Sequence, residues 1–264
     1  MSTLAYAVSD STAMLRRQLL HMKRYPVLTF MLIGLPVILL LLFVYVFGGT
    51  LGNGLGGASG GRVAYANYVV PGILLMTLAS GAQGTAISVA MDMTEGIIAR
   101  FRTMAIFRPS VLTGHVIGSM IQTLLGLAAV TGVALLVGFR PNATPVEWLA
   151  AFGLLAMFAF ALTWLSVACG LVSKSVETAS NLPMPLMLLP FLSSGFVPTD
   201  SMPYALRLFA EYQPFTPAIE TLRGLLLGTA IGHSAALATA WSAVITVVCF
   251  LWAKALYNRG PRQP

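Results

Sequence analysis

The segment Ser193–Gly224, "SSGFVPTDSMPYALRLFAEYQPFTPAIETLRG", lies between two long apolar runs and crowds prolines and charged side chains into a short stretch. Pro203 precedes one helical pattern, and Thr216 with Pro217 indicates the N-cap and first residue of a second, which ends near Gly228. Each piece has about 10 to 12 residues, or roughly 15 to 18 Å, which is too short to cross a hydrocarbon core of about 30 Å. The segment therefore predicts a re-entrant helical hairpin between two membrane spans.

The composition of the whole chain requires a membrane. Apolar residues make up 57% of the 264 positions and charged residues only 9%, whereas ordinary globular domains carry about a quarter charged residues. The length fits about six spans of roughly 20 residues and leaves no room for an additional soluble catalytic domain. We therefore expect an all-α membrane protein with six transmembrane helices, forming a single transmembrane domain over residues 1–264.

Six long apolar runs give the expected spans. The fifth run contains three prolines, which remove backbone donors and should bend it. The spans are expected at Tyr25–Phe47, Ala66–Met91, Thr113–Gly138, Trp148–Val172, Val176–Val197 and Ser234–Ala253.

The remaining segments connect or flank these spans. Residues 1–25 place apolar side chains on one stripe and basic ones on the other side, which predicts an amphipathic interfacial helix among anionic headgroups; a disordered basic tail is the alternative. The glycine-rich stretch 48–61 predicts a mobile connector. Cys169 and Cys249 lie inside apolar runs and are interpreted as small buried side chains. The chain thus divides into the interfacial helix 1–25, spans one to five within 26–197, the re-entrant hairpin 198–232, and the last span with a tail at 233–264.

The distribution of basic residues predicts the orientation. With the N-terminus in the cytoplasm, eleven of the 15 Lys and Arg residues fall on the cytoplasmic side and four on the outer side. Because cytoplasmic loops carry the excess of Lys and Arg, this arrangement favours two cytoplasmic termini and an even number of spans. The hairpin is then extracellular. Its charges Glu211, Glu220 and Arg223 are functional or paired if they lie within the membrane, or simply solvated if they lie at the headgroup level.

The hairpin also carries a pattern of prolines and glycines at fixed offsets. The pattern is Ser194-Gly195-x-x-Pro198, Met202-Pro203, Pro214-x-Thr216-Pro217 and Arg223-Gly224. With the surface helix and six spans, this resembles the type 2 ABC transporter permease family over essentially the whole chain. Within that family it resembles the branch of bacterial drug exporters typified by daunorubicin-resistance permeases.

This resemblance implies a non-catalytic membrane subunit of a bacterial multidrug exporter in the cytoplasmic membrane. ATP and Mg would be bound by two copies of a soluble ABC ATPase subunit, and a second permease chain, identical or homologous, would complete the path. The branch favours hydrophobic drugs or lipid-like compounds as cargo, and export of a polysaccharide or glycolipid is the rival within the family. We expect no cofactor on this chain and no nucleic-acid partner.

The loop between the second and third spans resembles the family's coupling helix, which sits in a cleft of the ATPase subunit. It is a cytoplasmic loop with an aromatic anchor among charges, which a closing ATPase pair can push. A basic loop that only sets topology is the alternative. Related permeases often have a proline where Ala105 stands, so the end of this helix is expected to differ here. The residues expected to couple to the ATPase are Glu95, Arg100, Phe101, Arg102 and Met104.

Two further sets of residues are expected to act in transport. Uncharged polar side chains within the second and fifth spans are candidates for the substrate path, with helix-to-helix hydrogen bonding as the alternative. The path candidates are Gln83, Asn181, Ser193 and Ser194, and the expected outer gate comprises Pro203, Glu211, Pro214, Pro217, Glu220 and Arg223.

Other functional classes lack their sequence features. The chain has no G-x-x-x-x-G-K-[ST] run, so it should not bind ATP in the usual way. Its three histidines are far apart in sequence, and we expect no metal site. A secondary transporter would show inverted repeats and acidic residues at mid-span, and an intramembrane enzyme would need a nucleophile or a His/Asp pair at a defined depth. We find neither pattern.

Overall fold

The computed structural model describes residues 12, 16, 20, 26–56, 61–96 and 109–258. Within these ranges every regular element is helical and there is no β-strand. The expected interfacial helix, apart from three positions, and most of the expected coupling loop lie outside the described residues.

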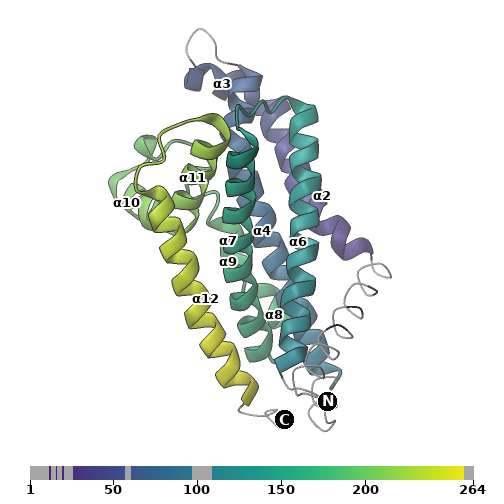
Figure 1. Cartoon of the computed structure of the whole chain (residues 1–264). Coiled ribbons are helices and arrows are strands. Elements are labelled where there is room, and N and C mark those ends of the chain that lie inside the picture. The colour runs from purple at the N-terminus through teal and green to yellow at the C-terminus, as the bar shows by residue number, and fades with distance from the viewer. Residues whose placement is uncertain are drawn as a thin grey trace.

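The described helices follow one another with short connections (Figure 1). They are α2 (Pro26–Leu42), the π-helical turn η1 (Phe43–Phe47), α3 (Gly48–Gly56), α4 (Arg62–Thr94), α6 (Pro109–Val137), α7 (Pro145–Val172), α8 (Val176–Asn181), α9 (Met184–Leu188), the 3₁₀ turn η3 (Thr199–Ser201), α10 (Tyr204–Tyr212), α11 (Phe215–Leu227) and α12 (Ser234–Asn258).

Five helical segments in the described ranges are long and apolar enough to cross a membrane. They confirm, with shifted ends, five of the spans expected from hydropathy. The segments are Leu32–Gly52, Arg62–Thr94, Leu112–Val137, Pro145–Val172 and Ser234–Tyr257.

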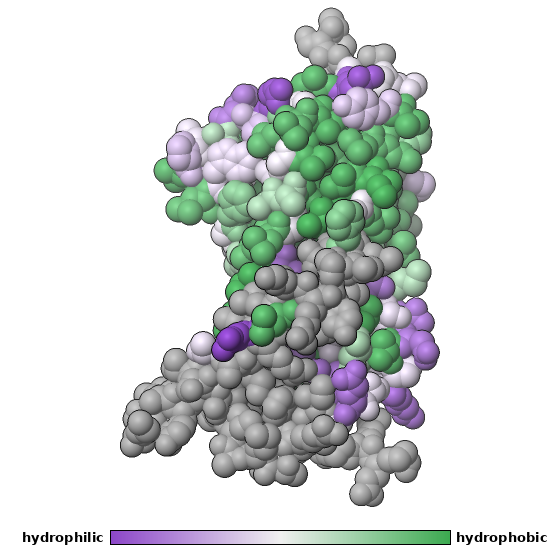
Figure 2. Space-filling view, turned by 90° about the vertical axis from the view of Figure 1, so that its right-hand side faces the viewer, coloured by the Kyte–Doolittle hydropathy of each residue, from purple (hydrophilic) through white to green (hydrophobic). Residues whose placement is uncertain are grey.

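The long helices run side by side along the molecule, and α10 and α11 pack at one end, which we call the hairpin end (Figure 1). The opposite end, where α4 stops and α6 starts, we call the loop end. α4 is the most central helix, with 72% of its most apolar window buried, whereas α12 has only 17% buried. On the face that Figure 2 shows, the coloured side chains between the two ends are largely hydrophobic, and hydrophilic ones gather toward the ends, as expected of a bundle in a membrane.

Local sequence signals fix several helix ends. Thr144 and Glu147 form a reciprocal capping box in front of α7, and Pro145 occupies its first turn. Ser175 caps α8 by accepting a hydrogen bond from the backbone amide of Thr178. Gly228 ends α11 in the left-handed region, at φ +75°, which favours glycine.

The fifth expected span is not a continuous helix. α8 stops at Asn181, α9 covers only Met184–Leu188, and turns follow as far as Val197. The prolines at 183, 185 and 190 explain the interruption because each lacks the N–H that would continue the helix. The prolines therefore interrupt this segment, as their loss of backbone donors indicated, and no long helix forms here.

This broken segment nevertheless runs along α4. Near the loop end, the side-chain amide of Gln83 donates to the carbonyl of Ser180 at 3.0 Å. Toward the hairpin end, the backbones of Gly72 and Gly195 come into contact. Residues 72 to 83 of α4 cover roughly 16 Å at 1.5 Å per residue, so the segment spans at least half of a hydrocarbon core.

The expected mobile connector at 48–61 is wrong for the residues that the structure describes. Residues 48–56 form the helix α3, and η1 joins it to α2. A β-carbon on Gly52 would lie 2.1 Å from the carbonyl oxygen of Gly61. The glycines at this end of the bundle therefore permit a close backbone approach as well as lowering helix propensity.

Glycines also bring neighbouring elements close to α4. A β-carbon on Gly81 would lie 2.5 Å from Thr123 Oγ1 on α6, and one on Gly170 of α7 would lie 2.7 Å from Val89 Cβ. Small residues allow such approaches between membrane helices. A β-carbon on Gly84, by contrast, would meet no neighbouring atom within 4 Å, so only part of the glycine-rich stretch of α4 serves close packing.

We expect Gly72→Ala to lower stability and Gly84→Ala to leave it nearly unchanged. A β-carbon on Gly72 would lie 2.9 Å from both the Cα and the carbonyl oxygen of Gly195, which are backbone atoms that cannot rotate away. Overpacking of this kind costs about 1 to 3 kcal/mol. Thermal unfolding of the purified protein in detergent measures the effect, and equal melting temperatures for the two variants would contradict the close contact.

Candidate functional site

The hairpin formed by α10 and α11 holds a buried arginine, Arg223, of which only 7% is exposed. Its Nη1 donates to Glu220 Oε1 at 2.7 Å, one turn earlier on α11. Its Nη2 donates to the carbonyl oxygens of Tyr68 on α4, at 3.1 Å, and of Ser194, at 2.9 Å. The guanidinium carbon also lies 4.0 Å from the centre of the Tyr68 ring. Arg223 therefore ties three separate segments together.

The carbonyl of Ser194 is the meeting point of these contacts. It accepts from Arg223 and also from the hydroxyl of Tyr68, at 2.9 Å. Two donors on one carbonyl fix the turn at 193–196, which is buried and not helical. Because irregular backbone at membrane depth is tolerated only where protein or water satisfies it, these side chains make the turn possible.

Other hairpin side chains satisfy the rest of the same turn. Gln213 Nε2 donates to the carbonyl of Leu189 and to Thr216 Oγ1, both at 3.3 Å. Thr216 Oγ1 accepts the backbone amide of Ser194 at 3.3 Å. Within the turn, the hydroxyl of Ser193 donates to the carbonyl of Pro190 and accepts the amide of Gly195. The hairpin thus clamps the proline-broken segment from Leu189 onward.

The hairpin helices confirm the expected boundaries, with one correction. α10 starts after Pro203, and α11 ends at Gly228, as predicted. α11 starts at Phe215, however, and its N-cap is Pro214, so the prediction of Thr216 as the N-cap is wrong. The hydroxyl of Thr216 instead accepts the amide of Ser194 in the broken segment. At the start of α11, Gln213 Oε1 accepts the amide of Phe215.

The three expected gate charges separate into two groups. Glu220, which is partly exposed, pairs with the buried Arg223, whereas Glu211 bonds to Arg207 at 2.7 Å on the exposed surface of α10. Arg207 also pairs with Asp200 at 2.8 Å. The hydrogen bond to Glu211, together with the nearby acidic charges, raises the pKa of the Arg207 guanidinium above its ordinary value. Glu211 therefore belongs to a solvated ion-pair group and not to the clamp.

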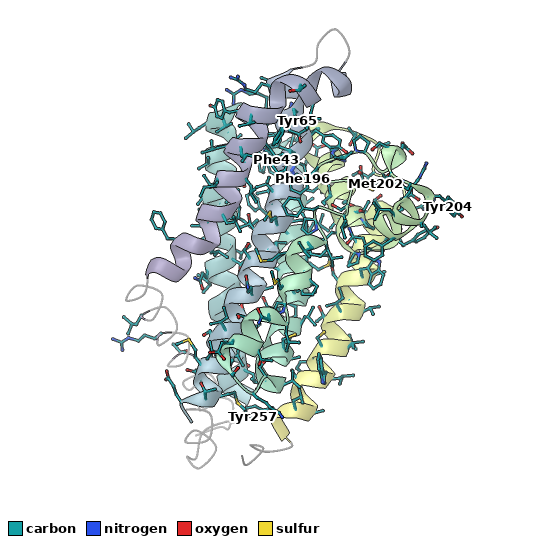
Figure 3. All side chains as sticks on the ribbon, turned by 180° about the vertical axis from the view of Figure 1, so that it is seen from behind. Phe43, Tyr65, Phe196, Met202, Tyr204 and Tyr257 are labelled. Carbon is teal, nitrogen blue, oxygen red and sulfur yellow. The ribbon has the colours of Figure 1, made fainter. Side chains whose placement is uncertain are left out.

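The expected path residues do not form one cluster. Asn181 is exposed beside the Gln83 contact on the broken segment, whereas Ser193 and Ser194 are buried in the clamp. The aromatic rings of Phe43 and Phe196 lie 4.8 Å apart and bring η1 against the same turn, close to Tyr65 in the interior (Figure 3). Tyr204 points away from the bundle on α10 (Figure 3).

At the loop end the structure shows a pair that the sequence pattern does not reveal. His115 Nε2 lies 3.0 Å from Asp92 Oδ2, and both residues are more than nine-tenths buried. In the sequence the histidine stands alone because its partner is 23 positions away. One feature of the sequence could have indicated the pair. Asp92 lies near the end of one span and His115 near the start of the next, on either side of the same loop.

Of the expected coupling residues, the structure describes only Glu95, which caps the end of α4 and is exposed. Arg100, Phe101, Arg102 and Met104 lie outside the described residues. In the described ranges no group of three or more His, Cys, Asp or Glu residues is placed to hold a metal ion. Cys169 and Cys249 are free and buried. Across these same ranges the arrangement offers mechanical links between helices and no assembled catalytic group.

Comparison of the sequence with known proteins identifies its family. The ABC-2 type transporter family matches residues 10–227, which is most of the chain. The chain belongs to this family. It is thus a multi-pass membrane permease, a transporter subunit that is not itself catalytic and that works with an ABC ATPase subunit.

The individual relatives share less than a third of the aligned residues with this chain. The chain is 29% identical over 228 residues to the daunorubicin resistance ABC transporter permease protein DrrB1 of Streptomyces coeruleorubidus, an alignment that covers 86% of this chain and 78% of the relative. It is 24% identical over 181 residues to the probable doxorubicin resistance ABC transporter permease protein DrrC of Mycobacterium tuberculosis, strain CDC 1551 / Oshkosh, with 69% and 66% covered. The DrrC protein of strain H37Rv matches equally.

We expect Arg223→Met to loosen the hairpin of this ABC-2 permease. The change removes charge-assisted donors from Ser194 and Tyr68 and strands Glu220, a loss of about 1 to 3 kcal/mol. Arg223→Lys keeps the charge without the planar fork and should fall between the parent and Arg223→Met. Thermal unfolding and the rate of protease cleavage near Pro198 measure both effects.

The matched control is Arg207→Gln, which removes an arginine from the exposed face of the same hairpin. It should change neither measurement appreciably, because exposed ion pairs contribute little. If Arg207→Gln destabilises the hairpin as much as Arg223→Met, the clamp is not what holds it.

Proposed function

We propose that this chain is the membrane-spanning subunit of a bacterial ATP-driven exporter in the cytoplasmic membrane, with a hydrophobic drug or lipid-like compound as cargo. Two such permease chains, identical or homologous, would assemble with two copies of a soluble ABC ATPase. The observation that carries the proposal is the alignment of 86% of the chain with a permease named for daunorubicin resistance. The strongly apolar composition and the absence of a P-loop motif support it.

We propose that the chain crosses the membrane six times, with the segment 176–197 as the fifth crossing. The course of this segment along α4 supports the crossing, and the hydrogen bonds of the clamp would allow non-helical backbone at that depth. The excess of basic residues supports an orientation with both termini in the cytoplasm and the hairpin outside. The loop end would then be the cytoplasmic end.

Coupling would run through α4. The loop that follows it carries Glu95, Arg100, Phe101, Arg102 and Met104, which we propose dock in a cleft of the ATPase. α4 has 33 residues and is therefore roughly 50 Å long. Its far end contacts Arg223 through the carbonyl and ring of Tyr68. A push on the loop would thus reach the hairpin through one continuous, mostly buried helix.

The hairpin would act as the outer gate. Its clamp holds the broken segment in place, so a displacement of α11 would also displace the backbone at Ser194. Cargo would pass beside the second and fifth spans. The proposed gate residues are Pro203, Glu211, Pro214, Pro217, Glu220 and Arg223, and the proposed path residues are Gln83, Asn181, Ser193 and Ser194.

Phe101→Ala tests the coupling. The chain purified alone should hydrolyse no ATP, and co-expression with its ATPase should give a stable complex that exports daunorubicin from loaded vesicles. Phe101→Ala should leave membrane insertion intact and lower the drug exported per ATP hydrolysed, because the loop loses its aromatic anchor.

Phe30→Ala is the matched control, since Phe30 is an exposed aromatic side chain on α2 and does not belong to the loop. Export by Phe101→Ala equal to that of the parent would count against the coupling role. If the chain exports daunorubicin without any ATPase, it acts as a secondary transporter and the proposed ATP-driven mechanism is wrong.

Single cysteines test the orientation. In a chain with Cys169 and Cys249 replaced by alanine, Asp200→Cys should react with a membrane-impermeant maleimide in intact cells, since this side chain is exposed beside the hairpin. Glu177→Cys, exposed on α8, should react only after the cells are permeabilised. The reverse pattern would overturn the proposed topology.

A further inference from the structure

Asp92 and His115 lie on opposite sides of the loop that joins α4 to α6. Asp92 is two residues before the end of α4, about 3 Å along the helix, and His115 is six residues after the start of α6, about 9 Å. Their side chains meet at 3.0 Å. The pair therefore closes the base of the segment that contains residues 95–108.

The pair is directional and buried. Asp92 has 6% of its surface exposed and His115 has 4%. An aspartate oxygen accepts, so Nε2 donates to Oδ2, and Nδ1 of His115 is buried with no hydrogen-bond partner. In surroundings of low dielectric a hydrogen bond of this kind holds its geometry more firmly than it would in water, because competing water is absent.

The neighbourhood is a packed apolar cluster contributed by four helices. Val89 of α4 abuts Gly170 of α7, where a β-carbon would clash at 2.7 Å. The rings of Trp164 on α7 and Phe250 on α12 meet edge to face, with centroids 4.8 Å apart. α4, α7 and α12 are thus fitted closely at this end by shape. α6 contributes Leu112 and Val116 to the cluster, on either side of His115.

Apolar side chains fix neighbouring helices by shape, and a hydrogen bond between two buried side chains adds a directional constraint on sliding and rotation. The link between α4 and α6 at the loop end includes such a bond. A load applied to the loop pulls on the end of α4 and the start of α6 together only if these ends keep their relative position.

We infer that Asp92 and His115 are positioning residues that hold the ends of α4 and α6 in register, so that a displacement of the loop between them moves both helices as one unit. In the transport cycle this would make ATP-driven motion of the loop productive. That second statement rests on the proposed function, whereas the register itself is a property of the chain alone.

The first test measures the register without the ATPase. Nitroxide labels at Thr94→Cys and Ile117→Cys, both exposed at the loop end, report the separation of α4 and α6 in lipid nanodiscs by electron paramagnetic resonance. The labelled chain also carries alanine at Cys169 and Cys249. Labels at Val63→Cys and Leu136→Cys, exposed near the hairpin end of the same two helices, serve as the internal control.

The informative variant is Asp92→Leu with His115→Leu. It removes the hydrogen bond of the pair and replaces both side chains by apolar ones of similar size. We expect the distance distribution at the loop end to broaden and the one at the hairpin end to stay as in the parent. Asp92→Asn, which keeps an acceptor, and the exchanged pair Asp92→His with His115→Asp should retain a narrow distribution. Glu177→Gln, an exposed acid near the same end, should have no effect.

The second test measures coupling in the complex with the ATPase, with daunorubicin as the transport probe. The double leucine variant should lose several-fold in drug exported per ATP hydrolysed, while Asp92→Asn and the exchanged pair recover most of that loss. A loss of stability alone would lower export and hydrolysis together and would not be restored by exchanging the two residues.

Several outcomes overturn the inference. A double leucine variant with a narrow distance distribution at the loop end shows that the pair does not set the register. If the double leucine variant fails to accumulate in the membrane, the variant with the two residues exchanged is measured in its place. A folded exchanged variant with a broad distance distribution at the loop end would also overturn the inference. If the parent chain binds no ATPase, the proposed function fails. The distance measurements then still test whether Asp92 and His115 set the register of α4 and α6.

Discussion

A buried backbone carbonyl or amide without a partner is costly, and the stretch from Leu189 to Gly195 meets this constraint with side chains. Pro190 lies in this stretch, Pro183 and Pro185 precede it, and no continuous helix covers its backbone. Gln213, Thr216, Arg223 and Tyr68 supply the missing partners from α4 and from the hairpin. The hairpin and α4 therefore hold the broken segment in place, since their side chains donate to its carbonyls and accept one of its amides.

Hydropathy and helix-end chemistry predicted much of this architecture. Five spans follow directly from runs that exclude charge, and Pro203 and Gly228 placed the ends of the hairpin helices because their backbone requirements are local. The prediction of a mobile connector in the glycine-rich stretch after the first span was wrong, because it rested on the low helix propensity of glycine in water. The structure shows a helix at 48–56, where hydrogen bonding within the segment overrides propensity.

The candidate sites were less predictable because their partners are remote in sequence. The charge of Arg223 left open whether it is paired or solvated, and although Glu220 lies one turn away, the carbonyls of Tyr68 and Ser194 lie 155 and 29 positions from it. Asp92 and His115 each look ordinary alone, and only the antiparallel register of α4 and α6 brings them together. Sequence pattern therefore indicates which groups need partners, whereas tertiary structure decides which groups provide them.

The contact between Gly72 and Gly195 has a mechanical consequence. Neither residue has a side chain, so the spacing of these two backbones does not depend on any rotamer. Motion on one side of the contact is passed to the other without the slack that a flexible side chain would introduce. The spacing of the two segments at this contact can therefore change only if one of the two backbones moves.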